Sequence, residues 1–294
     1  MDLSTTANGK AAQPVTFWYG CNVLRHGDII HACLDILRAL GYEPAPVGGV
    51  DYCCGTVKDA NQLAAGGMAT RTVGKLNARA VPVVVWCPSC HSHMHDFMGR
   101  TNDQHFDMTY LVELLHAKRE RLAPLLVHDV PLRVFLHQHV GFNDLVPVNR
   151  MVPELLGLIP GLQVVEATYT APGYMCASFA AIPKALEDIN NNTARAAKAS
   201  GADAVVTIFH QCYRELVGLD AAGAIPVYNY IQLIARSMGL PYRDEYKEWK
   251  RAGEGSTELI GSERVAKVGI QFYERAILPE LKKRPKLRNS DPGS

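Results

Sequence analysis

The sequence has no long hydrophobic run, almost no net charge and no nucleotide-binding motif. Its longest apolar runs, such as residues 81–86, are the length of a strand, far short of the roughly 18 to 20 residues that a membrane helix needs. The formal net charge of +1 gives no electrostatic case for nucleic acid or acidic lipid as a partner. A phosphate-binding loop and a flavin fingerprint are both missing. The sequence therefore predicts no nucleic-acid partner, no membrane span and no flavin site of its own.

The composition is that of a globular protein with sizeable cores. Hydrophobic residues make up 48% and charged residues 20% of the chain, and 294 residues leave room for two ordinary domains. The first residues lack the basic-then-apolar layout of a secretory signal. Clustered thiols without such a signal favour a reducing compartment, so we expect a cytoplasmic location.

Five of the eight cysteines lie within 70 positions and share one pattern. A single cysteine is followed after 31 residues by an adjacent pair and a glycine, and after 31 more by a pair with two residues between them. The residues are Cys21, Cys53, Cys54, Gly55, Cys87 and Cys90. The last pair has the spacing of zinc ligands, whereas adjacent side chains of an extended backbone point apart. Adjacent thiols suit an object with several metal atoms, so the set favours a multi-iron cluster over a single ion.

Three other interpretations of these cysteines remain open. A disulfide framework requires an oxidising compartment and usually a smaller domain. A redox dithiol at Cys87 and Cys90 leaves three cysteines unexplained, and zinc needs only four ligands. Cys33 lies on the apolar stripe of an expected helix and is interpreted as a buried hydrophobic residue. Gly55 is expected to turn the chain with a positive φ and to bring its backbone close to the bound group.

The pattern Cys-x31-Cys-Cys-Gly-x31-Cys-Pro-x-Cys resembles the cysteine-rich CCG domain of the B-type subunit of heterodisulfide reductase and its relatives. The relatives include the iron–sulfur proteins of glycolate and lactate oxidation and the B-type proteins of the heterodisulfide reductase-like complex of bacterial sulfur oxidation. The resemblance implies a noncubane [4Fe–4S] assembly. It also implies that the five ligands are Cys21, Cys53, Cys54, Cys87 and Cys90.

Hydrophobic periodicity predicts an α/β fold with mostly parallel sheets. In the first half we expect strands at residues 15–19 and 81–86 and helices at 29–40, 57–79 and 109–118. Residues 44–50, rich in Pro and Gly, are expected to form a loop. Cys21 and the pair Cys87 and Cys90 follow expected strands, and parallel sheets place their sites at the carboxyl ends of strands.

The second half repeats the first with fewer cysteines. Cys176 lies 122 positions after Cys54, and Cys212 lies 122 positions after Cys90. We therefore predict two tandem CCG domains, residues 1–125 with the intact motif and residues 126–294 with a degenerate copy. The second half is expected to hold strands at 133–136, 162–167 and 204–208, helical stretches at 143–158 and 178–200, an exposed charged stretch at 242–251, one helix at 261–281 and an exposed basic tail at 282–288.

The second copy keeps sulfur and imidazole groups that form a candidate second metal site. They are His137, His139, Cys176, His210 and Cys212. Three interpretations stay open: a vestigial site, a site for zinc or a smaller iron–sulfur cluster, and a substrate site with a cysteine thiol and His210 as proton donor. His91, His93 and His95 follow the last cysteine pair as surface residues or hydrogen-bond donors. The candidate catalytic residues are His91, His210 and Cys212.

The resemblance implies an oxidoreductase component that works within a multi-subunit complex. Its partners would be a C-type heterodisulfide reductase protein with cubane clusters and an A-type flavoprotein. The substrate would be a disulfide, thiol or persulfide, and the degenerate second copy favours a sulfur species carried on a lipoate-binding protein. Two alternatives remain: an electron-relay component of a glycolate- or lactate-oxidising complex, and a zinc-bearing scaffold without catalytic activity.

Overall fold

The computed structural model of the protein describes residues 11–56, 61–240 and 242–286. The chain forms two compact units whose segments alternate along the sequence. The first unit contains the described residues up to Val130 together with Phe142–Pro160 and Ile231–Tyr242, and the second contains the rest. The predicted boundary after residue 125 separates the two copies of the sequence repeat, whereas the two units are defined by contacts. The boundary therefore stays a prediction.

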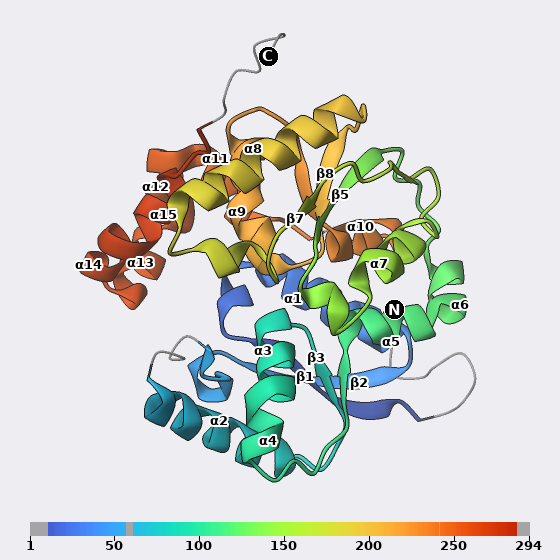
Figure 1. Ribbon diagram of the computed structural model, residues 1–294, viewed down its shortest axis with the longest axis vertical. Helices are drawn as coiled ribbons and strands as arrows, with labels where there is room; N and C mark the ends of the chain where they lie inside the picture. Colours follow the sequence, from blue (N-terminus) through green and yellow to red (C-terminus); the bar gives the residue numbers. More distant parts are fainter. Residues whose placement is uncertain (1–10, 57–60, 241, 287–294) are drawn as a thin grey trace. The chain divides into compact units, whose positions relative to one another are not determined.

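The first unit is built on a four-stranded sheet in which all the neighbouring strands are parallel (Figure 1). The strands are β1 (Gln13–Gly20), β2 (Tyr42–Gly48), β3 (Val83–Val85) and β4 (Met108–Tyr110), in the order β2-β1-β3-β4. The three valines of β3 are buried, as expected for a central strand that is covered on both faces. The predicted α/β class with parallel sheets is confirmed.

The predicted loop at residues 44–50 is wrong, because most of this stretch belongs to strand β2. Pro44 lies opposite Val15 and Pro46 lies opposite Phe17 in the register with β1. Proline has no N–H to donate, and residues two apart in a strand direct their N–H to the same side. Since β2 is the edge strand of the sheet, both prolines fall on its unpaired side, where no hydrogen bond is lost.

The first unit contains helices from three stretches of the chain. They are α1 (Gly27–Ala39), α2 (Gln62–Asn77), α3 (Pro88–His93), α4 (Gly99–Thr101), α5 (Leu111–Ala117), α6 (Arg119–Leu122), α7 (Val148–Leu156) and, from its second residue on, α10 (Tyr230–Ser237). Cys33 on α1 is completely buried, as predicted for a core residue. Positions 57–60 of the predicted helix at 57–79 lie outside the described residues.

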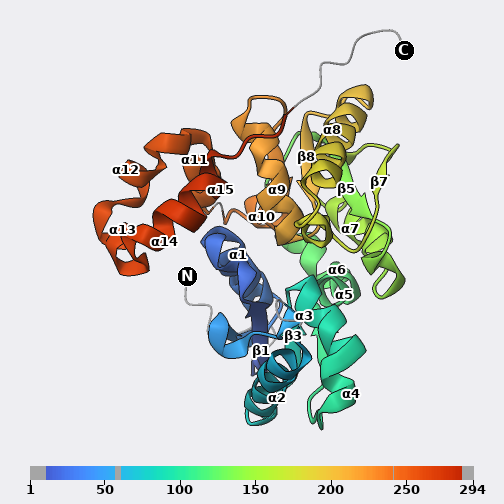
Figure 2. The ribbon, with the colours of Figure 1, turned by 60° about the vertical axis from the view of Figure 1, so that its left-hand side comes forward.

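The second unit contains a sheet with the same strand order. β5 (Arg133–His139), β6 (Gln163–Val164), β8 (Ala204–Thr207) and β9 (Val227–Asn229) are arranged as β6-β5-β8-β9, and β7 (Thr170–Ala171) pairs with the end of β5. Helices α8 (Pro183–Ala199) and α9 (His210–Ala221) contact β8 and lie beside it in Figure 2. The shared order is compatible with the predicted tandem repeat.

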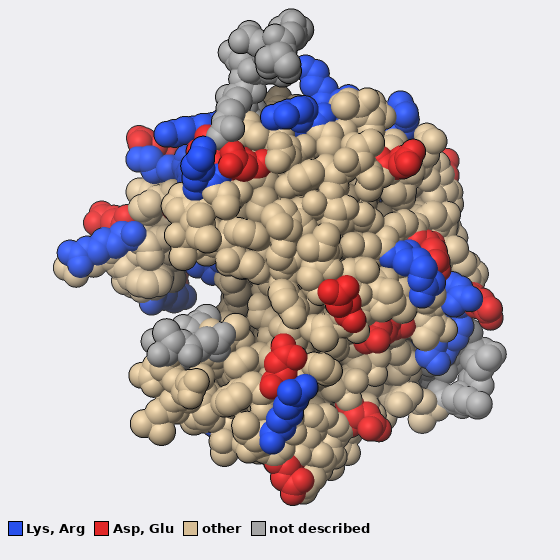
Figure 3. Space-filling view, viewed as in Figure 1, with Lys and Arg blue, Asp and Glu red and all other residues tan. Residues whose placement is uncertain are grey.

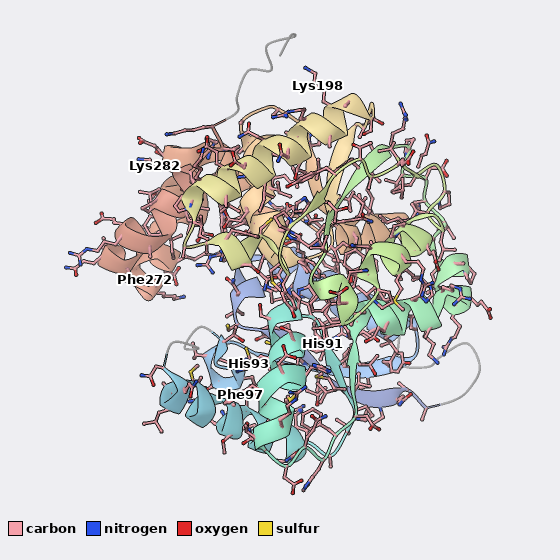
Figure 4. All side chains as sticks on the ribbon, in the orientation of Figure 1. His91, His93, Phe97, Lys198, Phe272 and Lys282 are labelled. Carbon is pink, nitrogen blue, oxygen red and sulfur yellow. The ribbon has the colours of Figure 1, made fainter. Side chains whose placement is uncertain are left out.

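The C-terminal part of the second unit is a series of short helices. They are α11 (Glu245–Ala252), α12 (Ser256–Ile260), α13 (Ser262–Val268), α14 (Ile270–Phe272) and α15 (Leu278–Lys282). The single helix predicted at 261–281 is wrong, because the chain breaks at Gly269 and forms a π-helical turn at Tyr273–Ile277. Phe272, labelled in Figure 4, is 58% exposed.

The charged stretch at 242–251 is more buried than predicted. Lys247 donates to the Val227 carbonyl at 2.6 Å and lies 3.5 Å from the Asp220 carboxylate. Lys250 donates to the Glu280 carbonyl, also at 2.6 Å. These buried ammonium groups are compensated by hydrogen bonds, and they attach α11 to β9 and α15. Beyond Lys286, the predicted tail lies outside the described residues.

No helix in the described part of the chain combines the length and the apolar character that crossing a membrane requires. Figure 3 shows Lys and Arg interspersed with Asp and Glu over the visible face, in line with the net charge of +1.

Candidate functional site

The five cysteines of the first half collect at the carboxyl ends of three neighbouring strands. Cys21 directly follows β1, and Cys53 follows β2 after the 3-10 turn Val50–Tyr52. Cys87 precedes α3, which follows β3 and carries Cys90 in its first turn. Because these strands are adjacent in the order β2-β1-β3, their loops meet at one edge of the sheet. We call these five cysteines the five-cysteine group.

The sulfur atoms of this group contact one another. The Cys21 and Cys53 Sγ atoms are 3.8 Å apart. Side-chain hydrogen bonds link Cys54 to both Cys53 and Cys90, and Cys90 to Cys87. All of them are buried except Cys21, which is partly exposed. None of the eight cysteines forms a disulfide, and all eight lie within the described residues.

Hydrogen bonds within the five-cysteine group shift the pKa values of its thiols in opposite directions. Hydrogen bonds from Cys21 and then from Cys54 lower the pKa of Cys53 to about 2. The same contact with Cys53, together with burial, raises the pKa of Cys21, and the bond to Cys53 raises the pKa of Cys54 to about 12. One thiolate is thus stabilised by its neighbours, which keep their protons. Five thiolates would need bound cations to balance their charge.

Two hydrogen bonds that the sequence does not reveal hold the loop of the adjacent pair. Trp18 Nε1 donates to the Tyr52 carbonyl at 2.9 Å. The Thr72 hydroxyl, on the buried side of α2, donates to the Cys53 carbonyl at 2.8 Å. Both donors are distant from the loop in sequence, so no local pattern indicates them. They fix the backbone that presents Cys53 and Cys54.

We expect Thr72→Val to lower the free energy of unfolding by about 1–3 kcal/mol, because the shape is kept while the buried Cys53 carbonyl loses its donor. Urea unfolding of the purified chain measures the change. Thr70→Val, at an exposed position of the same helix, is the control and should change stability by less than about 0.5 kcal/mol. Equal effects of the two substitutions would contradict the role of Thr72.

Gly55 adopts the left-handed backbone conformation that was predicted for it. Its φ is +94°, and a Cβ atom added there would lie 2.8 Å from the carbonyl oxygen of Ala65. Glycine is therefore required both by the conformation and by the close approach of α2. The residue shapes the turn after Cys54.

The three histidines after Cys90 lie in different environments. His91 packs against Tyr110 and Phe142, with ring centroids 5.3 and 5.7 Å away, so it is not a solvated surface residue. Burial, and to a lesser extent His95, lower the pKa of His91 to about 4. His91 and His93 are labelled on α3 in Figure 4. His95 is exposed and pairs with Asp96, so the surface interpretation describes it well.

A second cluster of ligand-type side chains lies in the second unit. It consists of His137, His139, Cys176 and Cys212, all buried, with their ligand atoms within 4.8 Å of one another. We call it the four-residue group. The two histidines are two apart near the end of β5, so they point to the same face, and Cys212 lies in the first turn of α9. Cys176 begins the 3-10 turn Cys176–Phe179.

The two thiols of the four-residue group have pKa values that are shifted in opposite directions. Burial raises the pKa of Cys176, whereas hydrogen bonds from Cys176 and the two histidines outweigh burial and lower the pKa of Cys212. The Cys212 charge likewise raises the pKa of His139 despite burial, and burial lowers the pKa of His137. The group therefore places a negatively charged sulfur among the other ligand atoms, which suits the binding of a cation.

His210 is buried but does not belong to this group. It begins α9, two positions before Cys212. Residues two apart on a helix point to nearly opposite sides, so His210 and Cys212 do not face the same point. The structure thus brings together four of the five residues of the predicted second site.

Together the fold and the cysteines define a class of domain: a parallel α/β domain with a thiol cluster at the carboxyl edge of its sheet. Residues 15–95 match the family model described as the CCG cysteine-rich domain. The match runs from β1 to just beyond α3 and includes all five cysteines of the five-cysteine group. A search of curated proteins found no match. The cysteine-rich domain and the four-residue group indicate metal or iron–sulfur binding and make a redox role plausible.

Proposed function

We propose that the chain is the iron–sulfur subunit of a heterodisulfide reductase-like complex. The observation that carries the proposal is the convergence of five thiols from three strand ends, within the segment that matches the CCG domain. Cys21, Cys53, Cys54, Cys87 and Cys90 would hold a noncubane [4Fe–4S] cluster. When bound, such a cluster accepts or gives single electrons and offers an iron that binds sulfur.

The residues of the first unit orient this site. Trp18 and Thr72 hold the loop of the adjacent pair, as described above. Cys21 is the one partly exposed member of the five-cysteine group, so a substrate would approach from its side. Leu24, three positions later in the sequence, is 55% exposed and offers an apolar contact. The other four cysteines are buried, so the surrounding protein excludes water from them.

The reaction supported by this arrangement is disulfide reduction or its reverse. The sulfur–sulfur bond breaks, two electrons enter, and each sulfur takes one proton to give two thiols. The electrons come from or go to partner proteins in the cytoplasm, a C-type iron–sulfur protein and an A-type flavoprotein of the heterodisulfide reductase kind. A sulfur species on a lipoate-binding protein fits the same chemistry. His91 is a candidate to contact the substrate, although with its lowered pKa it is neutral at pH 7 and offers no imidazolium proton.

Metal analysis of the anaerobically purified chain tests the proposal. We expect about four irons and four labile sulfides per chain and an EPR signal that changes when a thiol or disulfide is added. An unchanged signal would favour the electron-relay component of a glycolate- or lactate-oxidising complex. Zinc without iron or sulfide would contradict the redox function and leave the scaffold interpretation.

A further inference from the structure

The hydrogen bonds behind the four-residue group fix the tautomers of both histidines. His137 Nδ1 lies 3.0 Å from the Thr193 hydroxyl, which already donates its own proton to the Ile189 carbonyl at 2.8 Å. Thr193 therefore accepts the proton of His137 Nδ1. His139 Nδ1 lies 2.8 Å from the Pro172 carbonyl, which can only accept, so this nitrogen also carries a proton. In both neutral rings the second nitrogen, Nε2, consequently presents a lone pair.

These two lone pairs point at the same place. The Nε2 atoms of His137 and His139 are 3.0 Å apart, so either a proton on one ring or a bound cation must lie between the two lone pairs. The Cys176 Sγ lies 3.4 Å from one Nε2 and 3.6 Å from the other. Without a proton or a metal ion among them, these electron-rich atoms would repel one another in a buried place. The close distances therefore indicate a positive charge between the ligand atoms.

Three of the distances between donors are close to those around one tetrahedral ion, and all four ligand atoms lie within 4.8 Å of one another. Zinc bonds of about 2.0–2.1 Å to nitrogen and about 2.3 Å to sulfur, at tetrahedral angles, place nitrogen and sulfur about 3.6 Å apart and two nitrogens about 3.4 Å apart. The observed sulfur–nitrogen distances of 3.4 and 3.6 Å agree, and the nitrogen–nitrogen distance of 3.0 Å needs only a small expansion. A cluster of several irons would have to push these donors farther apart.

We propose that His137, His139, Cys176 and Cys212 bind a single zinc ion in a closed structural site. Two thiolates and two neutral imidazoles balance the double charge of the ion, so a neutral assembly is buried. Four protein ligands leave no open position for water or substrate, which is typical of structural rather than catalytic zinc. Thr193 and Pro172 act as the outer partners that orient the histidines. The ion would connect the end of β5 with the 3-10 turn at Cys176 and the start of α9.

This inference does not depend on the iron–sulfur cluster, so it is tested in the full-length Cys53→Ala chain, in which the five-cysteine group is broken. Expressed with zinc in the medium, that chain should hold about one zinc per molecule and almost no iron. A further His139→Ala substitution should reduce zinc by about tenfold or more. His105→Ala, at an exposed histidine, is the matched control and should keep the zinc.

Cobalt replacement keeps the test decisive if the His139→Ala chain fails to fold. The Cys53→Ala chain, stripped of zinc and loaded with Co²⁺, should show the intense visible bands of tetrahedral sulfur–nitrogen coordination. Added zinc should remove these bands and raise the melting temperature of the stripped protein. Zinc at background level without tetrahedral cobalt bands would overturn the proposal and assign the positive charge to a proton shared among the four groups. Stoichiometric iron in the zinc-supplied chain would overturn it in favour of a small iron–sulfur cluster.

Discussion

Replacing Cys53 or Cys54 with Ala is expected to remove nearly all cluster iron and labile sulfide from the chain. Each of these thiols contacts another member of the five-cysteine group, Cys53 through Cys21 at 3.8 Å and Cys54 through Cys90. In the proposed cluster the two adjacent sulfurs would bind different irons, so no neighbouring thiol could substitute for the lost one. Iron and sulfide analysis and EPR of the anaerobically purified variants measure the loss.

Cys33→Ala is the matched control for this experiment. Cys33 is equally a buried cysteine of the first unit, but it lies in helix α1 and belongs to the hydrophobic core. The variant should keep its full iron content, with a loss of stability of about 1 kcal/mol for the deleted sulfur atom. An equal loss of iron in Cys33→Ala and Cys53→Ala would show that the assigned ligand set is wrong.

Gly20→Ala is expected to damage the site almost as severely without removing any ligand. Gly20 has a φ of +85°, which an L side chain adopts only with strain. A Cβ atom there would lie 2.7 Å from Cys87 Cβ and 3.2 Å from Cys87 Sγ. Either β1 or the loop at Cys87 must move, and we expect iron content to fall several-fold and unfolding free energy to fall by about 1–3 kcal/mol.

The control for this substitution is Gly67→Ala on helix α2. A Cβ atom at Gly67 meets nothing within 4 Å, and alanine is the better helix former by about 0.8–1.0 kcal/mol. This variant should therefore keep its iron and gain stability. Full iron content and unchanged stability in Gly20→Ala would show that the backbone at Gly20 does not constrain the five-cysteine group.

Some features could not be predicted from local sequence because a partner far along the chain decides them. The prolines at 44 and 46 indicate a loop, yet the segment forms a strand because the edge of the sheet offers a side where no N–H is needed. Lys247 and Lys250 belong to a stretch predicted to be exposed, and carbonyl groups of distant segments make their burial tolerable. The break of the predicted helix 261–281 at Gly269, whose φ is +92°, is by contrast a local feature.

The sequence alone determined the α/β class with parallel sheets and the position of Cys21, Cys87 and Cys90 after strands, because apolar runs and cysteine spacing can be read locally. That a strand also precedes Cys53 and Cys54 was decided by the tertiary structure. Only the tertiary structure decided which residues of the second half form one group. It joins His137 and His139 to Cys176 and Cys212 and leaves out His210. The reason is geometric, because the direction of a side chain depends on strand alternation, helix phase and the hydrogen bonds of residues such as Thr193. The spacing of the ligands in the sequence does not reveal these directions.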